Sequence, residues 1–295
     1  MKIAVGLPAY NEEKNISSII SKLKKYSFSI IVCDDGSTDS TKKIAEEMET
    51  HVISHPKNLG YGAAIKSIFD KARELEFDIL VTFDADGQHD ESEIQNVIDP
   101  ILKNQADIVI GSRFIEDMSS KIPKYRVLGI KAITKLSNFT SKNNLKDSQS
   151  GFRAYSKDVI KKIHPIETGM GVSTEILIKA SKENFKIVEV PITVSYEGET
   201  STNHPVSHGV SVILSTMKYT SIEHPLKFYG ISGLIFLSVG LFFIVWTLQE
   251  FGLTRAIITN LALIGIGMTL LGVILLVTGI MLFSIVSVIK DSQNR

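Results

Sequence analysis

Short apolar runs alternate with amphipathic stretches over residues 1–112. The runs predict strands, and the stretches, in which apolar residues recur at helical spacing, predict helices. The predicted strands cover residues 3–7, 29–34, 51–54, 79–83 and 107–110, and the predicted helices cover residues 12–25, 38–48, 61–74 and 91–103. Strands that alternate with helices build a mostly parallel sheet covered by helices. The sequence therefore predicts an α/β fold, whose ligands bind at the carboxyl ends of the strands.

The pattern changes after Lys227, because residues 228–295 contain only five charged side chains. Residues 228–249 and 256–289 carry no charge at all. A helix needs about 20 apolar residues to cross a bilayer. Buried helices of a soluble core are the alternative, but they rarely contain uncharged runs of this length. We therefore predict two transmembrane helices, at 228–249 and at 256–289.

Only residues 250–255 join the two predicted spans, so the spans form an antiparallel hairpin. Lys218, Lys227 and Lys290 flank the hairpin, against the single Arg255 in its turn, which favours cytoplasmic ends. The apolar stretch at the start of the chain is too short for the core of a signal peptide. We expect a multi-pass protein of the cell membrane, with its polar domain and both termini in the cytoplasm.

Apolar residues also recur near helical spacing just before the hairpin, within residues 206–222. An amphipathic helix lying along the membrane and an ordinary helix packed on the polar domain fit this pattern equally well. The expected organisation is a polar domain at 1–205, an interfacial helix and linker at 206–227, and the two spans.

The charges of the chain balance, with 32 lysines and arginines against 32 aspartates and glutamates. Binding to a nucleic acid requires a basic excess, so no nucleic-acid partner is expected. The single cysteine, Cys33, excludes an internal disulfide and a cysteine-based zinc site.

Polar clusters follow three of the predicted strands, at residues 8–12, 34–37 and 84–90. The second cluster either caps the next helix or accepts hydrogen bonds from a nucleotide. In the third, Asp84 and Asp86 point to the same side if the strand continues, and Gln88 adds an amide oxygen after the Gly87 turn. Such oxygens suit a hard divalent cation, Mg2+ or Mn2+, completed by substrate phosphate oxygens. A carboxylate loop that caps a helix is the alternative, but it does not account for Asp84.

Seven short motifs follow one another in the first 200 residues. They read Pro8-Ala-Tyr-Asn-Glu12, Asp34-Asp-Gly-Ser37, Asn58-Leu-Gly-Tyr-Gly62, Asp84-Ala-Asp-Gly-Gln-His89, Gly111-Ser-Arg113, Asp147-Ser-Gln-Ser-Gly-Phe-Arg153 and Val190-Pro191. In this order they resemble the inverting glycosyltransferases of family 2, and within it the branch of dolichyl-phosphate mannose and glucose synthases. The resemblance implies a GT-A fold, which binds a nucleotide sugar and a metal through an Asp-x-Asp motif. Members of that branch with transmembrane helices also fit the C-terminal hairpin.

The resemblance assigns the donor site residue by residue. The nucleoside would contact Pro8, Tyr10, Glu12 and Asp35, and the Mg2+ or Mn2+ ion and the diphosphate would contact Asp84, Asp86 and Gln88.

The residues that the resemblance implies in catalysis are Asp86, Arg113, Arg126 and Glu175. Arg113 and Arg126 would hold phosphate groups, because a guanidinium binds phosphate oxygens bidentately. Their alternative interpretation is as solvated surface side chains. Arg126 begins a segment that resembles the acceptor loop of the family. Glu175 would orient Gln149 or Arg153, or else remove a proton.

The activity implied by the resemblance is transfer of a single sugar to a polyprenyl phosphate of the dolichyl type, at the bilayer. The donor would be a UDP-hexose, a UDP-N-acetylhexosamine or GDP-mannose. Gly171 and residues 196–202 lack lysines that some mannose synthases carry, which disfavours mannose. A lipid phosphate is largely dianionic at pH 7, so no protein base is expected. The alternative is a membrane-anchored scaffold that binds nucleotide sugar without turnover. The transmembrane helices could also support a homo-oligomer.

Overall fold

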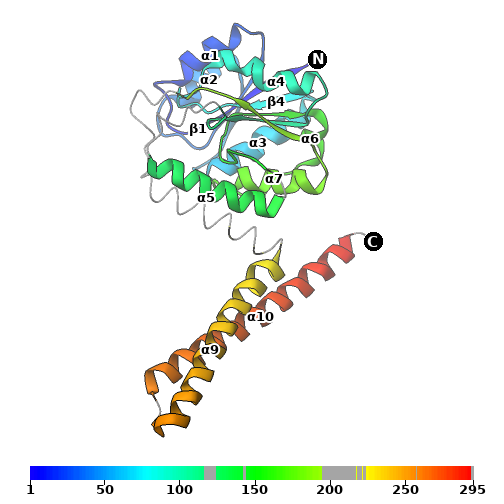
Figure 1. Cartoon of the computed structure of the whole chain (residues 1–295). Helices are drawn as coiled ribbons and strands as arrows, with labels where there is room; N and C mark the ends of the chain where they lie inside the picture. The colour runs from blue at the N-terminus through cyan, green and yellow to red at the C-terminus, as the bar shows by residue number, and fades with distance from the viewer. Residues whose placement is uncertain are drawn as a thin grey trace. The chain divides into compact units, whose positions relative to one another are not determined.

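The computed structural model of the chain describes residues 1–115, 124–141, 144–194, 217, 221, 224–256 and 258–293. The chain divides into two compact units, residues 1–216 and residues 217–295, and each is described by itself. The first unit is an α/β domain and the second contains two long helices (Figure 1).

A seven-stranded sheet forms the centre of the first unit. Its strands are β1 (Ile3–Ala9), β2 (Ser29–Asp34), β3 (His51–Ser54), β4 (Ile79–Thr82), β5 (Ile108–Ser112), β6 (Arg153–Ser156) and β7 (Ile187–Pro191). The spatial order is β3-β2-β1-β4-β6-β5-β7. Strand β6 runs antiparallel to β4 and β5, and the other neighbouring pairs are parallel. The predicted mostly parallel sheet is confirmed.

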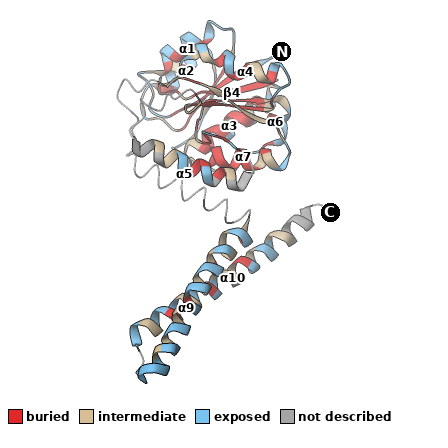
Figure 2. Ribbon diagram, viewed as in Figure 1, coloured by how far each residue is buried: buried red, intermediate tan, exposed pale blue. Residues whose placement is uncertain are grey.

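Helices cover both faces of this sheet (Figure 1). One apolar core joins the sheet to α1 (Ile16–Lys24), α2 (Thr41–Glu47) and α4 (Ile94–Leu102). A second core, on the other face, joins it to α3 (Tyr61–Glu74), α6 (Lys157–Lys162) and α7 (Val172–Lys182). Helix α5 (Lys124–Ser141) packs against α7. Figure 2 shows the buried residues concentrated along the sheet and the helix faces turned toward it.

The predicted element boundaries differ from the observed ones mainly in polar turns. Helix α1 begins at Ile16 rather than residue 12, because residues 13–15 form a turn before it. The predicted helix 91–103 begins as a short 3-10 turn, η1 (Glu91–Glu93), whose first residues are capped by the Asp90 carboxylate. The pattern did not predict the short strand β6, which has only four residues.

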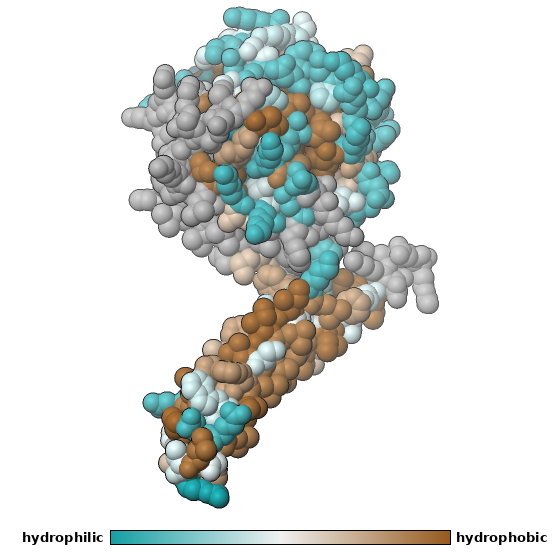
Figure 3. Space-filling view, in the orientation of Figure 1, coloured by the Kyte–Doolittle hydropathy of each residue, from teal (hydrophilic) through white to brown (hydrophobic). Residues whose placement is uncertain are grey.

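The second unit contains the turn η3 (Leu226–Gly230) and the helices α9 (Ile231–Thr254) and α10 (Thr259–Gln293). Leu226–Thr254 and Thr259–Val288 are long and apolar enough to cross a membrane, and most of their residues are exposed. Figure 3 shows the apolar surface that they present. Helices α9 and α10 occupy the two predicted segments with shifted ends, since α9 continues past Glu250 to Thr254 and is capped by Arg255, which has φ 56°. That the two helices cross a membrane stays a prediction.

Helices α9 and α10 pack closely through glycines. A Cβ at Gly272 would lie 2.5 Å from the backbone nitrogen of Leu237, and a Cβ at Gly240 would lie 2.9 Å from the carbonyl oxygen of Gly265. Only glycine allows backbones to approach this closely. These contacts run in opposite directions along the two helices, from Leu237 with Gly272 to Gly240 with Gly265, as the predicted antiparallel hairpin requires.

The predicted interfacial helix at 206–222 lies almost entirely outside the described residues, as does the predicted boundary of the polar domain at residue 205. Both stay predictions.

Candidate functional site

The loop after β4 carries the predicted metal ligands. Strand β4 ends at Thr82, so Asp84 and Asp86 lie in a turn and not on a continued strand. The side chains still alternate, because Phe83 and Ala85 are buried in the core whereas the two aspartates are half-buried. The structure therefore keeps the two carboxylates on the side of the loop that faces away from the core.

Asp84 is surrounded by His89 of its own loop and by groups from two other segments. The Tyr61 hydroxyl at the start of α3 donates a hydrogen bond to it at 3.2 Å, and Nε2 of His89 lies 3.7 Å away. A Cβ at Gly151 would lie 2.6 Å from its Oδ2 oxygen, so only glycine fits there. Burial opposes ionisation of Asp84, but His89, Tyr61 and the charge of Arg113 together hold its pKa below the ordinary value.

Asp86 and Glu12 add further negative charge at the same edge of the sheet. Asp86 accepts a hydrogen bond from the backbone N–H of Gln88 at 3.0 Å. Burial and the charge of Asp84 raise the pKa of Asp86. Burial, and then the charges of Asp86, Asp39 and Asp84, raise the pKa of Glu12 against a hydrogen bond from Asn15. Carboxylates that repel one another in this way form an environment that a cation stabilises.

These residues fit a divalent cation that is completed by a substrate. In the part of the chain that the structure describes, no group of three His, Cys, Asp or Glu side chains forms a ready-made metal cluster. Asp84 and Asp86 would supply only part of an oxygen coordination shell, and their role as metal ligands stays a prediction. Mg2+ is usually bound in this manner, through one or two carboxylates together with phosphate oxygens.

Arg113 follows β5 and faces the carboxylates from the other side. Its Nε and Nη2 atoms donate to the two oxygens of Asp147, at 2.6 and 2.8 Å, and Asp147 is fully buried. The Arg113 side chain is only 17% exposed. The interpretation of Arg113 as a solvated surface arginine is therefore wrong. Its charge acts on Asp84, although a contact with phosphate stays a prediction.

The predicted nucleoside contacts gather at the ends of β1 and β2. Pro8 pairs with Cys33 in the sheet register, and Tyr10 follows with 41% of its surface exposed. Asp35 is buried, and it accepts hydrogen bonds from the backbone N–H groups of Leu59 and Gly60 at 3.0 and 2.8 Å. Its carboxylate anchors that turn, and its contact with a nucleoside stays a prediction.

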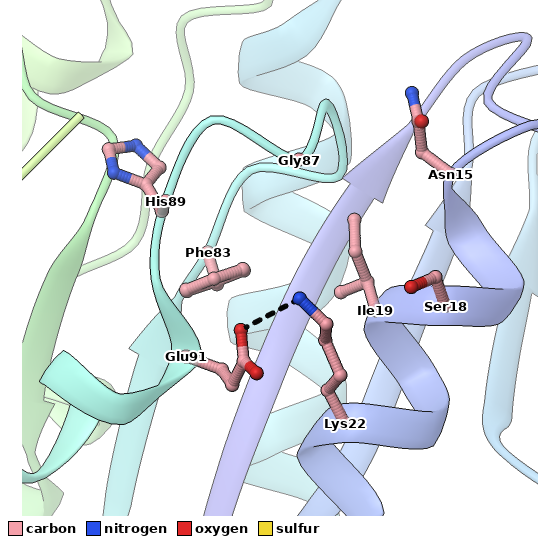
Figure 4. Close-up of a pocket in the computed structure, with 8 residues that line it drawn as sticks. All are labelled: Asn15, Ser18, Ile19, Lys22, Phe83, Gly87, His89 and Glu91. Carbon is pink, nitrogen blue, oxygen red and sulfur yellow. Dashed lines mark hydrogen bonds and ion pairs between the residues drawn. The ribbon is translucent and has the colours of Figure 1, made fainter. Parts of the chain in front are cut away.

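Residues 83–90, which follow β4 and carry Asp84 and Asp86, form the carboxylate loop. A pocket of about 200 Å³ lies beside this loop, against α1 (Figure 4). It is lined by Asn15, Ser18, Ile19, Lys22, Phe83, Gly87, His89 and Glu91. Figure 4 shows the ion pair between Lys22 and Glu91 that crosses it, at 3.3 Å. Asp84, Asp86 and Arg113 do not line this pocket, so it is distinct from the predicted donor site.

The comparison with known proteins decides the family. The sequence pattern of the family described as "Glycosyl transferase family 2" matches residues 4–164, which is more than half of the chain. The chain belongs to glycosyl transferase family 2. The family drawn from the seven motifs is confirmed, and the chain is a glycosyltransferase.

Three archaeal proteins are among the relatives of this family 2 glycosyltransferase. The chain is 34% identical over 229 residues to the UDP-N-acetylglucosamine–dolichyl-phosphate N-acetylglucosaminyltransferase of Methanococcus voltae, which covers 70% of this chain and 89% of that protein. It is 34% identical over 206 residues to the dolichol-phosphate mannosyltransferase of Pyrococcus furiosus, covering 65% of this chain and 56% of that protein. The glycosyltransferase AglJ of Haloferax volcanii matches 99% of this chain and 96% of its own length, at 24% identity.

A solved structure shows the fold of the family 2 domain. Glucosyl-3-phosphoglycerate synthase from Mycobacterium tuberculosis, in complex with Mn2+, uridine diphosphate and phosphoglyceric acid, matches with a TM-score of 0.57 and 22% identity. The match covers 74% of this chain and 78% of that one. At this identity the likeness carries the GT-A fold, which confirms the predicted fold class.

One predicted role of Glu175 in this glycosyltransferase, the orientation of Gln149 or Arg153, is wrong, and the other, removal of a proton, stays a prediction. Its buried carboxylate accepts hydrogen bonds from the backbone N–H groups of Ile166 and Glu167 and pairs with Lys179 at 2.7 Å. It does not orient Arg153, which donates instead to the carbonyl oxygens of Ser148, Ser150 and Ser173. Gln149 donates to Ser148 and Thr174. The backbone N–H groups that Glu175 binds leave no mark in a sequence, although the sequence does show Lys179 four residues later on the same helix.

The backbone of Arg126 lies in the helix α5, whereas the resemblance implied an acceptor loop there, and its side chain lies outside the described residues. Residues 196–202 lie outside them as well. Two residues of the site were missed although both stand in motifs that the sequence displays. Tyr61 contacts Asp84, and Asp147 fixes Arg113.

Proposed function

We propose that this glycosyltransferase moves one sugar from a nucleotide sugar to a polyprenyl phosphate at the membrane surface. The observation that carries the proposal is that one chain combines a carboxylate pair after β4 with two helices long and apolar enough to span a bilayer. A polyprenyl chain stays in the bilayer, so an enzyme that uses it has to be held there.

The names of the relatives support this acceptor and suggest a donor. The relative from Methanococcus voltae is named for UDP-N-acetylglucosamine and dolichyl phosphate, and that match covers 89% of it. This chain has Gly171 at a position where some mannose synthases carry a lysine, which also disfavours mannose as the transferred sugar. We therefore propose a UDP-activated sugar as the donor, with UDP-N-acetylglucosamine as the first to be tested.

The residues of the site would divide the reaction between them. Asp84 and Asp86, with Gln88, would hold a divalent cation, which supplies positive charge for the diphosphate leaving group when it is bound. Pro8, Tyr10 and Glu12 lie at the end of β1, where a nucleoside would bind. Arg113, fixed by Asp147, presents a positive charge beside the carboxylates, where an acceptor phosphate would be oriented for attack on the anomeric carbon. Attack in line with the leaving group inverts the configuration there.

The proposed acceptor makes a protein base unnecessary. The second pKa of a phosphate monoester is about 6, so the acceptor is mostly a dianion at pH 7. Glu175, the carboxylate considered as a base, is fully engaged by backbone N–H groups and Lys179. Catalysis would then rest on positioning and charge neutralisation. We expect the rate at subsaturating acceptor to rise with pH through about 6 and then level off. A rise that disappears in Glu175→Gln would contradict this mechanism.

The deciding experiment offers membranes containing the chain a panel of labelled nucleotide sugars, with polyprenyl phosphate and Mn2+ or Mg2+. Label should enter the lipid fraction from a UDP-activated sugar. Label from GDP-mannose alone would overturn the proposed donor and leave the acceptor in place. No label in lipid from any donor, with an enzyme that still binds nucleotide, would overturn the acceptor.

A further inference from the structure

Residues 192–194 directly follow β7. They contact both the strand that leads into Arg113 and the segment that carries Asp84 and Asp86. On one side they are fixed to β5, the strand that leads into Arg113. The backbone N–H of Ile192 donates to the carbonyl oxygen of Ser112 at 3.2 Å. Ile192 is 2% exposed, and a Cβ at Gly111 would lie 2.8 Å from its side chain. This segment is therefore part of the rigid edge that carries Arg113.

On the other side the same segment contacts the carboxylate loop. The backbone N–H of Thr193 donates to both carboxylate oxygens of Glu93, at 2.9 and 3.0 Å, and the Thr193 hydroxyl donates to one of them as well. Val194 pairs with His89 in an isolated antiparallel bridge. Glu93 closes the turn η1 that follows the loop. Residues 192–194 thus join the loop that carries Asp84 and Asp86 to the strand that leads to Arg113.

Helix capping does not explain Glu93. The residue occupies the N-cap position of α4, yet its side chain makes no capping hydrogen bond there. It binds instead a residue 100 positions later in the chain. Glu91, in the same turn, pairs with Lys22 of α1 and so provides a matched carboxylate with a different partner. Gly87 at the loop tip has φ 75° and nothing within 4 Å of a Cβ placed there, so the tip itself is open.

We propose that Glu93 and Thr193 are positioning residues, whose contact fixes the position of the carboxylate loop relative to Arg113. This inference rests on the proposed function in taking Asp84 and Asp86 as cation ligands. A carboxylate pair binds a cation tightly only when it is held in place before binding. Loss of the Glu93–Thr193 contact should therefore loosen the loop and weaken cation binding, while the fold remains.

The test compares four variants of the full chain in detergent. Thr193→Val removes the hydroxyl at constant shape, and Thr193→Ser restores it. Glu93→Gln removes the charge of the acceptor, and Glu91→Gln is the matched control in the same turn. Hydrogen exchange of the amides of residues 85–90 is measured without cation. Binding of Mn2+ is measured from the electron paramagnetic resonance signal of the free ion, alone and with uridine diphosphate. A thermal melt accompanies each variant.

Thr193→Val and Glu93→Gln should speed exchange in the loop and weaken Mn2+ binding by about 10-fold, the size reported for residues that hold metal ligands in place. Thr193→Ser and Glu91→Gln should stay within about twofold of the wild type. Unchanged loop exchange in both Thr193→Val and Glu93→Gln would overturn the proposal, as would faster exchange spread over the whole domain with a lowered melt. The exchange measurement needs neither cation nor substrate. It therefore decides the positioning role even if the wild type transfers no sugar to lipid.

Discussion

Carboxylates of the domain fall into two groups according to whether a basic side chain contacts them. Asp35, Asp147 and Glu175 are buried, and each accepts hydrogen bonds from backbone N–H groups or from a basic side chain. Such carboxylates fix loops. Asp86 and Glu12 instead have raised pKa values, because burial and neighbouring negative charges act on both of them. An uncompensated cluster of this kind is expected where a ligand supplies the missing positive charge.

Asp86→Ala tests this distinction. Transfer should fall by more than about 100-fold, beyond the loss usual for residues that only support metal ligands. Because the pKa of Asp86 is raised in the folded chain, its ionised form costs stability as pH rises through the carboxylate range. In EDTA at pH 7 the variant should therefore melt at or above the wild-type temperature. A variant that transfers sugar normally, or one that melts clearly lower, would contradict the assignment of Asp86 to a cation site.

We expect the thiol of Cys33 to be unreactive in the folded chain. It lies buried in β2, and burial, followed by the charges of Asp35 and Asp34, raises the pKa of its thiol to about 12. Since the thiolate is the reactive form, alkylation by iodoacetamide at pH 8 should be slower on the order of 1000-fold than in the unfolded chain, where the pKa is about 8.5. Mass spectrometry with and without guanidinium measures the ratio. Rapid labelling of the native chain would show that this strand opens.

At the scale of elements, the sequence pattern predicted the strands with long apolar runs and the helices with a clear apolar face. Strands β2 and β3 have the predicted ends; polar Asp35 follows β2, and polar Thr50 and His55 flank β3. Strand β6 was not predicted, because it lies beyond residues 1–112, where the alternation of apolar runs and amphipathic stretches predicted the elements. The site was predicted as a set of residues at strand ends, but not as a set of contacts. Arg113 donates a hydrogen bond to Asp147, which lies 34 residues later in the sequence. Such a contact depends on how the loops fold, which the sequence pattern does not show.

The hairpin of α9 and α10 offers a test at this scale. A Cβ at Gly272 would lie 2.5 Å from the Leu237 backbone, whereas a Cβ at Gly267 on the same helix would meet nothing within 4 Å. Gly272→Leu should therefore push the helices apart and destabilise the hairpin by about 1–3 kcal/mol, the usual cost of overpacking. Gly267→Leu is the matched control and should change little.

Unfolding of the hairpin can be followed directly, because the only tryptophan of the chain, Trp246, lies in α9. Its fluorescence during titration of the detergent-solubilised protein with sodium dodecyl sulfate gives the midpoint for each variant. Equal midpoints for Gly272→Leu and Gly267→Leu would show that the close glycine contacts do not determine the stability of the hairpin.

At the scale of the whole molecule, the two units divide the work of the proposed reaction. The residues proposed for the donor and for the cation all lie in the first unit, and the apolar helices all lie in the second. The first unit also has its own two apolar cores, one on each face of its sheet. The hairpin should therefore contribute by keeping the enzyme and a lipid acceptor in the same membrane, and not by shaping the donor site.

Removal of everything after Ser221 separates these contributions. The shortened chain should bind Mn2+ and a nucleotide sugar with nearly unchanged affinity, since its proposed ligands remain. Transfer to a short, soluble polyprenyl phosphate should persist, whereas transfer to a long-chain acceptor in vesicles should fall far more, because membrane anchoring raises the effective concentration of the enzyme at its acceptor. A thermal melt establishes that the shortened chain is folded before the comparison is made. If a folded, donor-binding chain loses transfer to both acceptors equally, the hairpin forms part of the acceptor site itself and its role as an anchor alone is wrong.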